Sequence, residues 1–114
     1  MAIIYKILPE ALWQAAQRSG SFAGAAIDLT DGYIHFSTAG QAVETARRHF
    51  HGQRELLLVA FEAEALGDAL RWEPSRGGDL FPHLYAVLDP ALALWVKPLP
   101  WAGGQHDFPE GWTA

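Results

Sequence analysis

Tyrosine, histidine and serine recur at alternate positions in the segment DGYIHFSTAG (31–40), and these residue types can bind a ligand or act on it. On a strand, alternate side chains share a face, so Tyr33, His35 and Ser37 are expected to point the same way. A histidine two residues from a serine presents a donor and an acceptor to a ligand lying across the sheet. The alternative is that His35 is a hydrogen-bonded structural residue and that Ser37 or Thr38 caps the following helix.

A second segment, GGDLFPHLYAVL (77–88), repeats this pattern. His83 and Tyr85 alternate onto one face, and Pro82 indicates an edge strand or the start of a strand. We predict that His83 and His35 lie on facing or adjacent strands and bound one cleft together with the serine and the tyrosines. The alternative is an aromatic core patch in which His83 only satisfies its own hydrogen bonds.

Two further charged residues are candidates for chemistry. Glu73 follows Trp72, and a carboxylate near an aromatic surface can have its pKa shifted enough for acid-base work or for stabilising a developing cation. Most such glutamates, however, are ordinary surface residues. Lys6 is one of only two lysines and sits in an apolar strand, where its ammonium must either reach the surface or meet a partner.

The segment ARRHFHGQR (46–54) collects positive charge at the end of a helix, where it complements the helix dipole. A solvated helix end explains this pattern without any function, and a phosphate contact made by an arginine is the functional alternative. His49 and His51 lie two residues apart and face different sides of a helix, so we expect no metal site.

Several elements must position these residues. Apolar and β-branched runs predict strands at 3–8, 33–37, 55–62, 70–73, 83–88 and 92–99, and capping and periodicity predict helices at 9–20 and 40–50. The residues between 20 and 33 are expected to form a Gly- and Ala-rich loop. The strand at 55–62 is apolar on both faces and is therefore predicted to be central, and Trp13 is expected to pack onto that sheet from the first helix.

The pattern as a whole predicts an α+β fold in which mostly antiparallel or mixed sheets form a cleft with two helices. We expect residues 1–114 to be one small domain with a core at about 3–99. The tail at 100–114 contains Trp101, Phe108 and Trp112, which a solvated linker seldom carries, so we expect it to pack on the surface of that core.

The composition excludes several classes of function. The 114 residues include 8 Lys+Arg and 13 Asp+Glu, a formal net charge of -5, so broad binding to a nucleic-acid backbone is not expected. The chain has no cysteine, which excludes thiolate catalysis and cysteine-bound metals and is typical of a reducing compartment such as the cytoplasm. No apolar run approaches the roughly 20 residues of a membrane span, and the N-terminus lacks a signal-peptide pattern, so we expect no membrane association.

The order of IYKI, Trp13, GYIHFST, LLLVAFE, RWE and FPHLYAVL resembles the bacterial family called domain of unknown function 952, from Ile4 to about Leu99. That family is grouped by fold with ADP-ribosyltransferases. The segment YIHFSTAGQAVETA is also similar to a strand and helix in RNA 2'-phosphotransferases of that fold. The resemblance implies a cleft between two small sheets that holds NAD or an ADP-ribosylated intermediate.

The same resemblance suggests roles for particular residues. Relatives often carry YHI where this chain has YKI, so Lys6 stands where a His or Arg would meet the cofactor, without the bidentate fork of Arg. The resulting candidates are His35 and Glu73 as catalytic residues, and Lys6, Ser37, Thr38, His83 and Tyr85 as ligand-binding residues.

Three hypotheses about function follow. In the first, the chain binds a nucleotide of the NAD or ADP-ribose type and carries out ADP-ribosyl or related transfer. In the second, it is a module that binds a nucleotide or another small metabolite without reacting it. In the third, it is a structural or interaction protein. NAD is the cofactor implied by resemblance, and neither the ligand nor the oligomeric state follows from the sequence.

Overall fold

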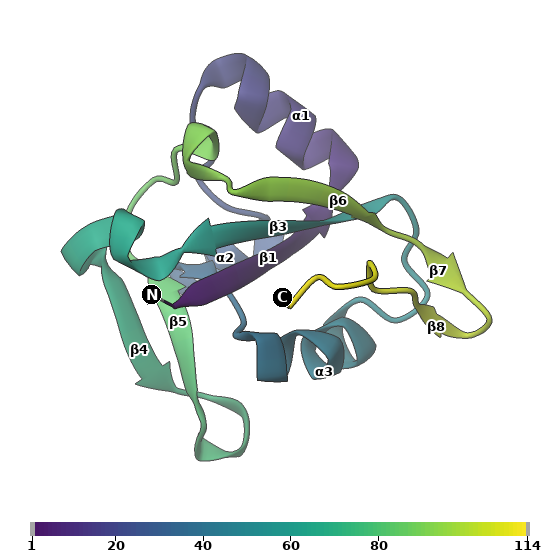
Figure 1. The fold of residues 1–114 in the computed structure, drawn as a ribbon. Coiled ribbons are helices and arrows are strands. Elements are labelled where there is room, and N and C mark those ends of the chain that lie inside the picture. Colours follow the sequence, from purple (N-terminus) through teal and green to yellow (C-terminus); the bar gives the residue numbers. More distant parts are fainter. Residues whose placement is uncertain (1, 114) are drawn as a thin grey trace.

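Two small antiparallel sheets form the frame of the structure, a computed structural model that describes residues 2–113 (Figure 1). The strands in chain order are β1 (Ile3–Pro9), β2 (Ile34–His35), β3 (Leu56–Glu62), β4 (Leu70–Pro74), β5 (Leu80–Leu84), β6 (Trp95–Leu99), β7 (Trp101–Ala102) and β8 (Gln105–His106). The α-helices are α1 (Glu10–Ser19), α2 (Ala26–Asp31) and α3 (Ala39–His49), and the short 3-10 helices are η1 (Ala63–Ala69), η2 (Arg76–Gly78) and η3 (Pro90–Leu92). The α+β class is confirmed.

The first sheet has the order β1-β3-β6, with β3 in the middle. Leu58, Val59 and Phe61 of β3 have no exposed surface, because residues on both faces of this strand are covered. The predicted central strand is therefore confirmed.

The second sheet has the order β2-β5-β4, so β5 is central, although Pro82 predicted an edge or strand-start position. The carbonyl of Pro82 accepts a hydrogen bond from the Phe36 N–H at 3.0 Å. Proline has no N–H to return this bond, and the pairing of β2 with β5 ends one residue earlier, at His35 opposite His83. Proline is tolerated because the neighbouring strand ends beside it.

A pair of backbone hydrogen bonds joins the two sheets. Tyr5 N–H donates to the Ser37 carbonyl at 2.8 Å, and Ser37 N–H donates to the Tyr5 carbonyl at 2.9 Å. This bridge brings the segment after β2 alongside β1, so that α3 starts next to the first sheet.

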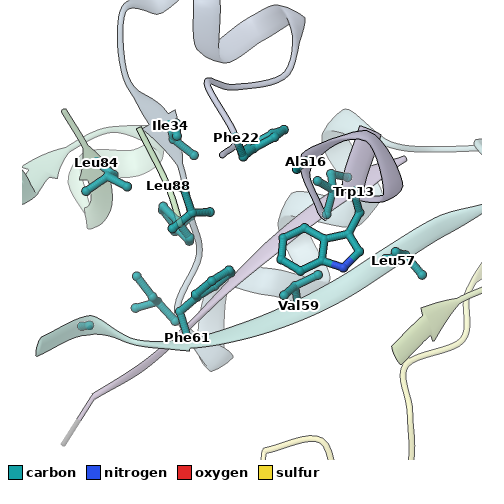
Figure 2. Close-up of a cluster of buried hydrophobic side chains, with 13 residues drawn as sticks. Trp13, Ala16, Phe22, Ile34, Leu57, Val59, Phe61, Leu84 and Leu88 are labelled. Carbon is teal, nitrogen blue, oxygen red and sulfur yellow. The ribbon is translucent and has the colours of Figure 1, made fainter. Parts of the chain in front are cut away.

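The larger hydrophobic core lies between α1, the first sheet and the core face of the second sheet (Figure 2). Trp13 from α1 is 2 % exposed and meets the Phe61 ring edge to face, with 6.2 Å between the ring centroids. Ile34 of β2 and Leu84 of β5 reach the same cluster from the second sheet. The predicted packing of Trp13 is confirmed, and one face of the second sheet is committed to this core.

A smaller core covers the other face of the first sheet, where α3 and the tail lie (Figure 1). The Trp112 ring meets Tyr5 edge to face at 4.9 Å between centroids, and Phe108 lies 5.0 Å from Trp112. Phe108 and Trp112 of the tail are therefore partly buried beside β1, whereas Trp101 contacts the rings of His51 and His106.

Several element boundaries differ from the sequence predictions, and the strand expected at 33–37 is shorter, Ile34–His35. The expected Gly- and Ala-rich loop contains α2, so the fold has three α-helices and not two. β5 ends at Leu84 and β6 begins only at Trp95, and between them Asp89 starts a 3-10 turn by accepting a hydrogen bond from the Ala91 N–H at 2.9 Å. Within residues 2–113, no helix has the length and apolar character needed to cross a membrane.

Candidate functional site

The two histidines lie opposite each other on neighbouring strands. His35 in β2 is the register partner of His83 in β5, and their rings meet edge to face with 5.5 Å between centroids. Cross-strand partners point to the same side of a sheet, and the residues next to them, Ile34 and Leu84, point into the core. The prediction that both histidines share one face is confirmed, and it is the face turned away from the larger core.

Two tyrosines surround this pair with aromatic rings. Tyr33 lies 4.1 Å from the His83 ring and 4.6 Å from the His35 ring, between centroids, so it covers both. Tyr85 lies 5.2 Å from Tyr33 and is exposed. His83 is only 4 % exposed, whereas the side chain of His35 keeps 30 % of its surface accessible. A ligand on this face would thus meet His35 and the tyrosines first.

Glu73 is tied to the same group of residues. Its Oε1 accepts hydrogen bonds from the Tyr85 hydroxyl at 2.7 Å and from Nδ1 of His83 at 2.9 Å. These bonds hold the pKa of Glu73 below its ordinary value, and the contact with Glu73 raises the pKa of Tyr85. An ionised carboxylate can only accept, so Nδ1 of His83 carries the proton.

This arrangement corrects the hypothesis that an aromatic surface perturbs Glu73. Trp72 is its neighbour along β4 and points to the opposite face, so Tyr85 and His83 set the state of the carboxylate. Glu73 is held ionised, which suits a hydrogen-bond acceptor or a group that stabilises positive charge, and does not suit a general acid. We call the surface formed by the following side chains the histidine face: Tyr33, His35, Glu73, His83 and Tyr85.

A buried aspartate holds His35 from the protein side. Oδ1 of Asp28 lies 2.7 Å from Nδ1 of His35 and accepts the His35 backbone N–H at 3.0 Å, and Oδ2 accepts the Ala25 N–H at 2.8 Å. Burial by itself raises the pKa of Asp28, but the bond to His35, the charge of Lys6 and the backbone N–H groups outweigh it and lower this pKa to about 2. Nδ1 of His35 is therefore the donor, and Nε2 points outward to Asp31, 3.0 Å away.

Lys6 meets a partner and does not reach the surface. Its Nζ lies 2.9 and 3.1 Å from the two carboxylate oxygens of Asp28 and donates to the His35 carbonyl at 2.9 Å. Burial lowers the pKa of Lys6, and the Asp28 carboxylate opposes that shift. Lys6 is 4 % exposed, so the ligand contact expected from the resemblance is corrected to a supporting role beneath His35.

Ser37 and Thr38 lie at the start of α3. The Ser37 hydroxyl is 2.9 Å from the hydroxyl of Thr45 in that helix and is buried, so Ser37 faces α3 and not Tyr85. Thr38 is the N-cap residue of α3, and its N–H donates to the Gln41 side chain at 3.0 Å. The capping interpretation of Thr38 therefore explains its position.

A hollow of about 290 Å³ opens beside the histidine face, close to the lower end of the size range of small-molecule sites. Its walls include Tyr33 and Tyr85 together with the exposed apolar side chains Leu29 and Val87. A larger hollow of about 520 Å³ lies elsewhere, lined by Lys97, Pro98, Pro100, Asp107, Phe108, Pro109 and Glu110. Neither of these two hollows is lined by a histidine, but Tyr33, which lines the smaller one, contacts the rings of both His35 and His83.

Sequence reasoning missed Asp28 because it lies in the segment expected to be a loop. The available signals were a lysine in an apolar strand, which requires a buried anion, and Gly24. Gly24 has a φ of +127°, and a Cβ there would lie 2.7 Å from the Cβ of Asp28. Only glycine lets the backbone approach this aspartate so closely. Within residues 2–113, no three histidine or carboxylate side chains lie close enough together to hold a metal ion.

Comparisons with known proteins agree on a family. Protein CC0527 from Caulobacter crescentus is similar in its X-ray crystal structure, with 48% identity over 92% of this chain and 93% of that chain and a TM-score of 0.89. Its solution NMR structure is also similar, with 48% identity over 93% of this chain and 91% of that chain and a TM-score of 0.83. No curated protein matches the chain. Residues 7–96 match the family described as Protein of unknown function (DUF952), and the chain belongs to that family.

Proposed function

We propose that this protein binds a small molecule of the nucleotide type, with NAD and ADP-ribose as the representative ligands, on the histidine face. The observation that carries the proposal is the pairing of His35 with His83 beneath Tyr33, which gathers ring nitrogens, aromatic faces and the ionised Glu73 on a surface outside the core. Planar bases and nicotinamide stack on aromatic rings, and ribose hydroxyls donate to carboxylates and imidazoles.

The neighbouring hollow supports the same proposal. Its apolar walls at Leu29 and Val87 offer a place for a planar ring, and Tyr33 and Tyr85 of the histidine face also line it. Ligand sites are commonly apolar pockets with a few convergent polar groups at one side. A nucleotide has this combination of a flat ring and a polar sugar.

The position of Lys6 favours binding without reaction. In the ADP-ribosyltransferase-like arrangement implied by the resemblance, a first-strand residue meets the cofactor. Here that residue is buried against Asp28 and offers no group to a ligand.

His35→Asn tests the proposal, because the asparagine amide can still donate to Asp28 while the outer ring edge is lost. We expect NAD or ADP-ribose at one hundred times its dissociation constant to stabilise the natural protein by roughly 2.7 kcal/mol, a rise of several degrees in Tm. The variant should fold and lose this response. His51→Asn is the matched control, since His51 is exposed and contacts Trp101 rather than the histidine face.

Two results would contradict the proposal. In the first, neither nucleotide shifts the Tm of the natural protein at millimolar concentration. In the second, His35→Asn unfolds more easily while its response to ligand is retained. The second result would favour the structural hypothesis for His35.

ADP-ribosyl or related transfer is a second candidate, favoured by Glu73. Cleavage of the bond between ribose and nicotinamide passes through an oxocarbenium-like state, and an ionised carboxylate held by two donors can stabilise that positive charge. Release of nicotinamide from NAD, measured by chromatography, should then require Glu73. Glu73→Gln should abolish the release and Glu110→Gln, in the tail, should leave it unchanged. Absence of release from the natural protein would reduce the function to binding.

A further inference from the structure

Arg76 lies at one end of the histidine face and is not balanced by a carboxylate. None of the ion pairs formed within residues 2–113 includes it. Its guanidinium is 4.9 Å above the ring of Phe81 and donates one hydrogen bond, from Nη2 to the Thr45 hydroxyl at 3.2 Å. A guanidinium has five N–H groups, so most of its donors have no acceptor among the described residues.

The strand register places Arg76 next to the histidines. Phe81 precedes His83 by two residues on β5, so the two side chains share a face and lie about 7 Å apart along the strand. Arg76 covers Phe81, and Thr45 is anchored to Ser37, which follows His35 by two residues. The arginine therefore continues the polar surface beyond the histidine pair.

The positive charge at the end of α3 is distributed unevenly. Arg47 and Arg48 share the single carboxylate of Glu44, which offsets one of their two positive charges within the helix. His49 lies one turn after Thr45 on the same side of α3. Burial lowers the pKa of His49, and the nearby charges of Arg76, Arg48 and His35 add to this effect.

We infer that Arg76, held by Thr45 and flanked by His49, forms a subsite for a phosphate group at the end of the histidine face. The guanidinium fork matches two oxygens of a phosphate, and the Phe81 ring beneath fixes the plane of that fork. The inference deepens the proposed function, and it rests on that function for the rest of the ligand.

The subsite gives the ligand a direction. A planar ring would lie at the end formed by Tyr33, Tyr85 and the apolar hollow, the sugar would lie at His35 and Glu73, and the phosphate would reach Arg76. This order predicts a preference for phosphorylated nucleotides over the corresponding nucleosides.

Titration with inorganic pyrophosphate, followed by NMR, tests the subsite without any knowledge of the natural ligand. We expect saturable shifts at the Arg76 Nε–H and at the amides of Thr45 and His49. Arg76→Gln should weaken binding at least tenfold. Arg71→Gln is the matched control, because Arg71 also lies over an aromatic ring, 5.1 Å from the centroid of Tyr85, but lacks the contact with Thr45.

The outcomes separate this inference from the proposed function. No saturable shift, equal binding by Arg76→Gln, or loss of binding only in Arg71→Gln would each overturn the phosphate subsite. A second titration compares ADP-ribose with adenosine. If ADP-ribose and adenosine bind with the same affinity, and Arg76→Gln binds each as tightly as the natural protein does, the subsite is wrong and the proposed function stands. If pyrophosphate binds at Arg76 and neither nucleotide nor nucleoside binds, the subsite stands and the proposed function fails.

Discussion

Replacement of Lys6 by methionine is the sharpest perturbation of the support beneath His35. The side chains of Lys6 and Asp28 are 5% and 0% exposed, and the two atoms Nζ and Oδ2 lie 2.9 Å apart. Breaking one side of a buried ion pair typically costs about 3–5 kcal/mol, because a charge is left without its partner. Asp28 keeps the bonds from His35 and from the Ala25 N–H, so we expect a loss near the lower limit, about 3 kcal/mol.

Urea denaturation at pH 7 measures this loss as a change in the free energy of unfolding. Lys97→Met is the matched control, since it removes the other lysine, which lies 4.8 Å above the Trp95 ring, and should cost no more than about 1 kcal/mol. Adding Asp28→Asn to Lys6→Met removes the unpaired charge and should restore at least about 1 kcal/mol relative to the single variant. A loss below about 1 kcal/mol for Lys6→Met, equal to that of the control, would refute the buried pair.

Three further predictions follow from the same structure. The pKa of Asp28 is about 2 in the fold against an ordinary value of 3.8, so this carboxylate contributes about 2 kcal/mol to the free energy of unfolding. The contribution is fully present above about pH 5 and is lost as the pH falls through about 2. In Asp28→Asn, the free energy of unfolding should therefore fall less steeply as the pH is lowered through this range. Trp13→Ala should cost about 3–5 kcal/mol in denaturation experiments, whereas Trp13→Phe should cost far less because the buried indole N–H has no partner within residues 2–113. Equal losses would contradict this packing. Gly24→Ala should lower the free energy of unfolding by about 1–3 kcal/mol, since the positive φ and the contact with Asp28 both oppose a Cβ. An unchanged Tm would show that this segment adopts another conformation.

Local patterns were sufficient to predict much of the frame. The apolar run at Leu56–Glu62 requires cover on both faces, which identifies a central strand without any tertiary information. Alternation in YIHFS and FPHLY was enough to place each histidine on the face of its own strand opposite the apolar residues, because the period of a strand is two residues whatever its neighbours are. The pairing of β2 with β5 then puts His35 and His83 on one face.

The parts that could not be predicted depend on long-range contacts. Pro82 suggested an edge because its missing donor is a local property, but the strand it disturbs, β2, is only two residues long, and that length is set by the fold. Ser37 belongs to the predicted alternation, yet the bridge to Tyr5 turns the chain toward α3 and pairs its hydroxyl with Thr45.

Asp28 shows the same limitation at the candidate site. The distance of 22 positions between Lys6 and Asp28 hides their pairing from any local pattern. Helix α2 is also too short to give a clear periodic signal, although its residues hold the carboxylate that orients His35.

NMR observation of the histidine and tyrosine side chains during a titration with ADP-ribose tests most directly whether the histidine face binds a nucleotide. We expect saturable shifts of the imidazoles of His35 and His83 and of the rings of Tyr33 and Tyr85, with the imidazole of His51 unaffected. Shifts confined to the tail around Phe108, or no shifts at millimolar ADP-ribose, would contradict the claim that the histidine face is a nucleotide site.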